Sequence, residues 1–280
     1  MLEIWYRIGD RLLPFSWTEH NFMLNALLAV LIVTPLFGML GTMVVNNHMA
    51  FFSDTIGHSA LTGIGIGVIL GLHQPLGAMV IFAVFMAVTV SLVKEFTMTS
   101  TDTVIGVFSA VAVALGIVIL SQGGGFNKYS GYLIGDILSI TPENIALLLM
   151  ILVGFMIYWY YSFNSLVLLT INPSLARSRG INVRRAEMVF TIALAVIVTV
   201  SIQWLGIMII NSLLILPAAA SRNFSRNIRQ YHFLTIVISM VSGITGLILS
   251  FYWDTASGAT IVLVAAFFFV VSFMKKHIYG

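Results

Sequence analysis

Long runs of apolar residues constrain the fold of this chain more than any other feature. A helix that crosses a bilayer needs about 20 mostly apolar residues. Seven strong candidates lie at 22–45, 75–93, 103–121, 143–161, 188–204, 233–252 and 257–274, and two weaker ones, rich in Gly, Ser, Asn and Pro, at 56–72 and 205–221. The sequence therefore predicts an all-α polytopic membrane protein with nine transmembrane helices, or eight if one weak segment is re-entrant.

The composition agrees with this prediction and excludes other classes of protein. Of the 280 residues, 59% are hydrophobic and 8% are charged, whereas a soluble domain is about half apolar and a quarter charged. The 13 Lys and Arg and 10 Asp and Glu side chains cannot coat a globule of this size in water, which excludes a soluble enzyme and a disordered scaffold. Cysteine is absent, which excludes a disulfide framework, a thiolate nucleophile and a cysteine metal site.

The basic residues predict the orientation in the membrane. When successive spans alternate, ten of the 13 Lys and Arg residues fall on one side, namely Lys94, Arg177, Arg179, Arg184, Arg185, Arg222, Arg226, Arg229, Lys275 and Lys276. Cytoplasmic loops carry such an excess. The sequence thus predicts that this side, with the C-terminus, is cytoplasmic. The same topology explains the pI near 9.3 without a nucleic-acid partner.

No linker or low-complexity run divides the sequence, which favours one membrane domain over 1–280. Residues 1–20 carry Trp5, Phe15 and Trp17 among polar residues, a pattern typical of an amphipathic segment at the membrane interface. Residues 163–187 form the largest hydrophilic segment on the predicted cytoplasmic side.

A short basic helix is predicted within this hydrophilic segment. Pro173 after Asn172 suits the first turn of a helix, and Gly180 suits its C-terminal cap. The helix either lies on the membrane with its arginines on lipid phosphates or docks a cytoplasmic partner.

The start of the second predicted span carries the most informative polar residues. An ionisable residue in a membrane segment costs roughly 2.5–3.5 kcal/mol by insertion scales and so marks a candidate functional site. Asp54, His58 and Thr62 recur every four residues and form one stripe on a helix. A carboxylate and an imidazole one turn apart can bind a divalent transition-metal ion, with Thr62 as possible support. Alternatively, Ser53 or Asp54 caps the helix and His58 bonds a neighbouring carbonyl.

Small residues form a second stripe on the same helix. Ser59, Gly63, Gly67 and Gly71 follow one another every four residues. Such a stripe lets two helices approach closely in lipid. The partner helix belongs either to the same chain or to a second copy.

Three further acidic residues stand near the ends of spans. Asp102 precedes an apolar run, which favours a capping role. Asp136, in the long outer loop, either attracts cations, receives a partner protein or is simply solvated, and Asp254 marks an outer turn. No ligand role is predicted for His20, His48, His73, His232 or His277.

Four segments together resemble one known family. The run Ser53–Gly63 resembles the Asp-x-x-x-His-[Ala/Ser]-x-Leu-x-Gly signature of bacterial zinc and manganese ABC-transporter permeases. Tyr132–Leu138 with Thr141–Glu143 resembles the outer-loop segment of that family. Asn172–Gly180 resembles its cytoplasmic coupling segment. Asn211–Ala220 resembles its Ser-Leu-Leu-x-x-Pro-Ala-Ala segment. The likeness covers about residues 23–275, and the sequence is most similar to the zinc-uptake permeases.

The resemblance implies a permease subunit of the bacterial inner membrane that does no chemistry of its own. It implies a homodimer in membrane lipid, two cytoplasmic ATP-binding subunits that use the ATP, and an extracytoplasmic metal-binding protein. Zn²⁺ or Mn²⁺ would be transported rather than held as a permanent cofactor, on a path lined by Asp54 and His58. The residues implied to couple the permease to the ATPase are Asn172, Pro173, Leu175, Ala176, Arg177 and Gly180.

A proton-coupled secondary transporter for metal ions is the main alternative. In such a protein Asp54, His58, Asp102 and Asp136 would relay protons. Secondary transporters usually show an internal repeat with paired broken helices, and the two halves of this sequence show none. A membrane scaffold without transport would leave the intramembrane pair of Asp54 and His58 unexplained.

Overall fold

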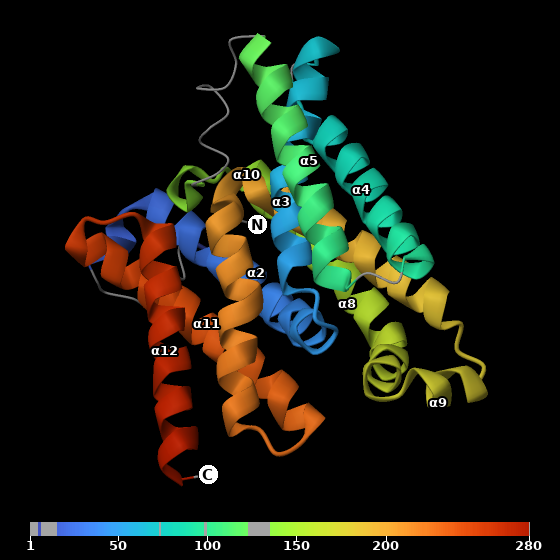
Figure 1. Cartoon of the computed structure of the whole chain (residues 1–280). Coiled ribbons are helices and arrows are strands. Elements are labelled where there is room, and N and C mark those ends of the chain that lie inside the picture. The colour runs from blue at the N-terminus through green and yellow to red at the C-terminus, as the bar shows by residue number, and fades with distance from the viewer. Residues whose placement is uncertain (1–4, 7–15, 73, 98–99, 123–134, 280) are drawn as a thin grey trace. The chain divides into compact units, whose positions relative to one another are not determined.

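Helices are the only regular elements in the part of the chain that the computed structural model describes, residues 5–6, 16–72, 74–97, 100–122 and 135–279 (Figure 1). The α-helices are α2 (Asn21–Asn46), α3 (Ala50–Ile69), α4 (Leu76–Phe96), α5 (Thr101–Gln122), α8 (Pro142–Ile171), α9 (Pro173–Ser178), α10 (Val183–Phe224), α11 (Ile228–Trp253) and α12 (Ser257–Tyr279). Two short 3-10 helices, η1 (Ser16–Glu19) and η2 (Ile137–Ser139), accompany them. Each predicted span falls on one of these α-helices, so the predicted all-α fold is confirmed.

Seven of the described helices, α2, α4, α5, α8, α10, α11 and α12, are long and apolar enough to cross a membrane. Helix α3 falls outside this group because its Ser, Thr, Asp and His residues lower its hydropathy. Helix α10, with 42 residues, would be about 63 Å long if straight, about twice the thickness of a bilayer core. Gly206 interrupts it with φ 73° and ψ 161°, a conformation open essentially to glycine alone. Thus α10 contains both predicted spans 188–204 and 205–221, and the chain is a multi-pass membrane protein.

The chain forms two compact units. The first comprises Met1–Thr42, Gly135–Gly154 and Ser212–Gly280, and the second comprises Met43–Ile134 and Phe155–Asn211. In the first unit, α11 packs along α12, and the Ser239 hydroxyl of α11 donates to the Thr34 carbonyl of α2 at 2.8 Å. The assignment of 1–280 to a single domain stays a prediction.

In the second unit, α3 packs closely against α4 (Figure 1). A Cβ added at Gly63 would lie 2.6 Å from the Met79 Cα, and one at Gly67 would lie 3.2 Å from the Pro75 Cβ. Two members of the predicted small-residue stripe therefore contact a helix of the same chain. Ser59 is buried and donates to the Ile56 carbonyl at 2.8 Å. Gly71 lies beyond the end of α3 in a turn with φ 70° and has no neighbour within 4 Å of a built Cβ.

The contact between α3 and α5 uses hydroxyl groups as well as apolar surface. The Thr55 hydroxyl donates to the Ile105 carbonyl at 3.4 Å, and the Thr62 hydroxyl donates to the Ala112 carbonyl. From the first hydrogen-bonded pair to the second, the residue number increases by seven on both helices, so α3 and α5 run parallel. These bonds satisfy buried polar atoms that would otherwise be costly in an apolar surrounding.

The close contact at Gly63 predicts a specific sensitivity. Replacing Gly63 with Ala should lower the stability of the purified protein in detergent by about 1–3 kcal/mol, because the new methyl group meets the α4 backbone. The matched control is Gly77→Ala on α4, where a built Cβ has no neighbour within 4 Å. Thermal unfolding followed by light scattering measures both, and equal midpoints for the two variants would contradict the packing seen here.

Candidate metal site

Asp54 and His58 lie one turn apart in the first half of α3. Asp54 Oδ2 is 3.5 Å from His58 Nε2, and the two side chains are 40% and 31% exposed. The carboxylate and imidazole are thus adjacent and accessible, as required for binding an ion from solution. No group of three or more His, Cys, Asp and Glu side chains that could hold a metal ion occurs among the described residues. One copy of the chain therefore offers a pair of such ligands.

Asn211 on α10 also belongs to this site. Its side-chain Nδ2 donates to Asp54 Oδ1 at 2.6 Å, so each Asp54 oxygen has a neighbour, Asn211 on one side and His58 on the other. Gly57 permits the approach of the two helices, because a Cβ there would lie 2.8 Å from Ile207 Cγ2. Ile207 is one turn before Asn211. The sequence alone does not connect Asn211 with this site, since 157 positions separate it from Asp54.

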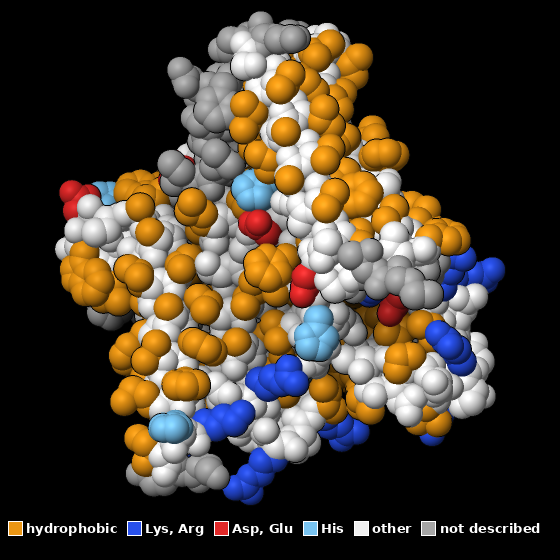
Figure 2. Space-filling model, viewed as in Figure 1, with side chains coloured by type: hydrophobic (Ala, Val, Ile, Leu, Met, Phe, Trp, Pro, Cys, Tyr) orange, Lys and Arg blue, Asp and Glu red, His pale blue; other side chains and the backbone are white. Residues whose placement is uncertain are grey.

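Asp54, His58 and Asp102 line one open cavity of about 780 Å³, whose other lining residues come from α3 and α5 and are mostly small or apolar. Figure 2 shows acidic and histidine side chains close together over these helices. Asp102 lies in the first turn of α5. The predicted capping bond at this end comes instead from Ser100, whose Oγ accepts the Thr103 N–H at 3.3 Å. Asp102, which was predicted from sequence to cap the helix, therefore lies in the same cavity as Asp54 and His58.

Thr62, the third member of the predicted polar stripe, does not line this cavity. Its side chain is buried and its hydroxyl donates to the backbone of α5. Asp136 accepts from the Leu138 N–H at 3.1 Å and caps η2. Asp254 ends α11 with φ 51°, which confirms the predicted turn. His232 lies on α11 with its Nδ1 2.7 Å from the Thr42 hydroxyl, and is a packing residue of the first unit.

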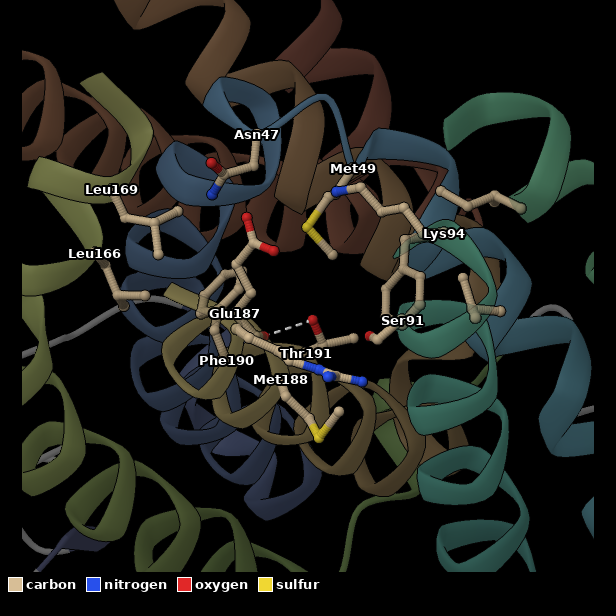
Figure 3. A pocket seen from close by; sticks show the side chains of 14 residues that line it. Asn47, Met49, Ser91, Lys94, Leu166, Leu169, Glu187, Met188, Phe190 and Thr191 are labelled. Atoms are coloured by element: carbon tan, nitrogen blue, oxygen red, sulfur yellow. Dashed lines mark hydrogen bonds between the residues drawn. The ribbon is translucent and has the colours of Figure 1, made fainter. Parts of the chain in front are cut away.

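A second, more enclosed cavity of about 150 Å³ lies among the ends of α2, α4, α8 and α10. Figure 3 shows Glu187 on one side of it and Ser91 and Lys94 on the other. Arg184 also lines it. Two basic side chains and one acidic side chain give this cavity a net positive charge, which disfavours a bare cation. Ile105 lines both cavities.

The predicted short helix is confirmed as α9. The Asn172 carboxamide oxygen accepts the N–H groups of Ser174 at 3.0 Å and Leu175 at 3.1 Å, and Pro173 opens the first turn. Gly180, with φ 77°, lies beyond its C-terminal end.

The two apolar side chains of α9 differ in exposure. Ala176 is fully buried within the chain, whereas Leu175 is 43% exposed. Arg177 is exposed as well. Leu175 and Ala176 are both among the residues implied to couple the permease to a partner, and of these two the structure leaves Leu175 available for that contact.

Comparison with known proteins shows the family. The sequence matches the ABC 3 transport family over residues 19–276. The chain belongs to this family. The resemblance inferred from the four sequence segments is therefore confirmed.

Relatives in the ABC 3 family match this chain over nearly its whole length. The high-affinity zinc uptake system membrane protein ZnuB of Haemophilus influenzae is 34% identical over 261 residues, which cover 92% of this chain and 98% of the relative. The manganese import system permease protein ScaB of Streptococcus gordonii is 26% identical, with 91% of each chain covered. A chain of PsaBC from Streptococcus pneumoniae, solved in complex with Fab, has the same fold, with a TM-score of 0.79, 23% identity, and 98% of this chain and 95% of that chain covered.

Proposed function

We propose that this ABC 3 chain is the membrane-spanning permease subunit of an ATP-driven importer for divalent transition-metal ions, zinc first and manganese next. The observation that carries the proposal is the Asp54–His58 pair, which faces an open cavity inside a membrane protein. An ionisable pair in such a position is costly and therefore marks a candidate functional site. Relatives named for zinc uptake and for manganese import support the choice of ion.

The ligand chemistry suits an ion that must be released again. One chain supplies one carboxylate and one imidazole, so two copies in a homodimer supply four ligands, two of them histidines. Zinc prefers four nitrogen or oxygen ligands in a tetrahedron. Manganese prefers more oxygen ligands, which water molecules would add. A site shared between two copies is also easily opened, because each copy holds only half of it.

The driving force comes from partners in this proposal. The described helices leave no cytosolic domain for ATP hydrolysis, so two cytoplasmic ATP-binding subunits supply it, and an extracytoplasmic metal-binding protein delivers the ion. Helix α9 receives the ATPase through its exposed Leu175. The basic segments, including α9, then face the cytoplasm together with the C-terminus.

The secondary transporter is supported by one observation, namely that Asp54, His58 and Asp102 share a cavity. Asp136, the fourth member of the suggested relay, instead caps η2. Metal uptake by vesicles with a hydrolysis-deficient ATPase partner separates the two mechanisms. Uptake that persists there and follows a proton gradient would favour the secondary transporter.

Removing either ligand should stop transport without unfolding the protein. We expect His58→Ala and Asp54→Ala each to reduce zinc and manganese uptake to background, because a single remaining ligand per chain cannot replace the water around the ion. His277→Ala, at an exposed position near the end of α12, is the matched control. Uptake of radioactive zinc into vesicles measures transport, and the protein yield, measured in parallel, shows whether each variant folds. Near-normal uptake by either variant would overturn the site assignment.

The docking role of α9 predicts a second phenotype. Leu175→Asp should insert normally but lose the ATPase during purification, because the contact would bury an unpaired charge. Arg177→Ala should do much less, since an exposed ion pair is worth about 0–1 kcal/mol. Co-purification of the tagged permease with its ATPase measures both. An ATPase that stays bound to the Leu175→Asp protein would move the docking site to the other basic segment, 222–229.

A further inference from the structure

We infer that Asn211 is a positioning residue of the metal site, which orients the Asp54 carboxylate and offers its own side-chain oxygen to the ion or to a water bound to it. This inference rests on the proposed transport of divalent metal ions. It extends that proposal by adding a neutral oxygen donor from α10 to the pair on α3.

The hydrogen bond fixes the orientation of the Asn211 amide. An ionised carboxylate only accepts hydrogen bonds, so the amide must turn its N–H group toward Asp54. The 2.6 Å distance between Asn211 Nδ2 and Asp54 Oδ1 fits this arrangement. Because the other carboxylate oxygen lies beside His58, the Asp54 side chain is held between two neighbours. A preorganised carboxylate loses less freedom when an ion binds.

The same orientation leaves the other end of the amide without a partner. Asn211 Oδ1 is buried and accepts no hydrogen bond from any residue that the structure describes. A buried acceptor without a donor is costly and needs an explanation. An arriving metal ion or its bound water supplies the missing partner. The amide thus holds Asp54 with its nitrogen, while its oxygen, which is buried and does not line the cavity, gains a partner when an ion binds at Asp54.

The backbone is built to allow this contact. Gly57, between Asp54 and His58, lets α10 come close enough for Asn211 to reach the carboxylate. A larger residue at position 57 would meet the Ile207 side chain, since a built Cβ lies 2.8 Å from its Cγ2. The contact between Asn211 and Asp54 therefore depends on the close packing of the α3 and α10 backbones, and not only on the rotamer of one side chain.

An amide oxygen as a ligand should matter more for manganese than for zinc. Manganese takes more oxygen ligands than zinc does, and zinc is satisfied by nitrogen and fewer oxygens. Loss of the Asn211 oxygen should therefore weaken manganese transport more than zinc transport. A residue that only packs against α3 would weaken both ions equally, through loss of folded protein.

The test compares Asn211→Leu, which replaces the amide with an apolar side chain of the same branching, with the α10 control Asn223→Leu, which removes an amide bonded to Ser272 in the first unit. Vesicles that contain the complete transporter are assayed for uptake across a range of zinc and manganese concentrations. We expect Asn211→Leu to raise the apparent KM for zinc about 10-fold and that for manganese further, while thermal stability and the control variant stay unchanged. Asn211→Ser, which is too short to reach Asp54, should give the same ion preference if the leucine variant folds poorly.

An unchanged KM for both ions, or an equal change for both, would overturn the role of Asn211. Failure of this inference can be distinguished from failure of the proposed function, because the proposed function is tested separately by Asp54→Ala and His58→Ala. If those two variants lose uptake while Asn211→Leu keeps the KM of the natural protein, transport stands and this inference alone fails. If all three transport normally, the metal path itself lies elsewhere.

Discussion

A carboxylate and an imidazole on one helix of a membrane protein have to be kept from lipid by other helices, because lipid cannot solvate either group. Helix α3 meets this requirement through small residues on several of its faces. Gly63 and Gly67 admit α4, Gly65 admits Ile119 and Leu120 of α5, and Gly57 admits Ile207 of α10. The side that bears Asp54 and His58 faces an open cavity. The close packing of α3 thus leaves these two side chains accessible from the cavity.

The local features of this arrangement follow from the sequence, and the long-range features do not. The spacing of Asp54 and His58 predicts their contact, since residues four apart lie only about 40° apart around a helix. Thr62 is eight residues from Asp54 and so turns away by about 80°, far enough to face α5 instead of the cavity. Asn211 and Asp102 reach the site through contacts between distant segments, which periodicity within one segment cannot reveal. Asparagine at the start of a motif is a weak signal unless the helix that faces it is known.

Caps and turns follow the same rule, since those set by neighbouring residues were predictable and those that depend on distant segments were not. Asn172, Pro173 and Gly180 act within a few residues of one another, and the predicted helix α9 was found where they indicate. The exposure of its residues was not predictable, because Ala176 is buried by segments outside α9. At the start of α5, two candidate caps lie close together, and the hydrogen bond from the Thr103 N–H to Ser100 leaves Asp102 for the cavity. Gly206 breaks α10 inside an apolar run, where a single glycine gives no distinctive signal.

The order of α9 and α10 along the chain connects the proposed docking helix with the residue that contacts Asp54. Helix α9 is capped by Asn172 at its N-terminal end, and its Ala176 is buried against the rest of the chain. It lies between the end of α8 and the start of α10, and α10 leads to Gly206 and then to Asn211. Asn211 in turn holds the Asp54 carboxylate. A displacement of α10 that removes the Asn211 hydrogen bond would leave the Asp54 carboxylate oriented by its contact with His58 alone.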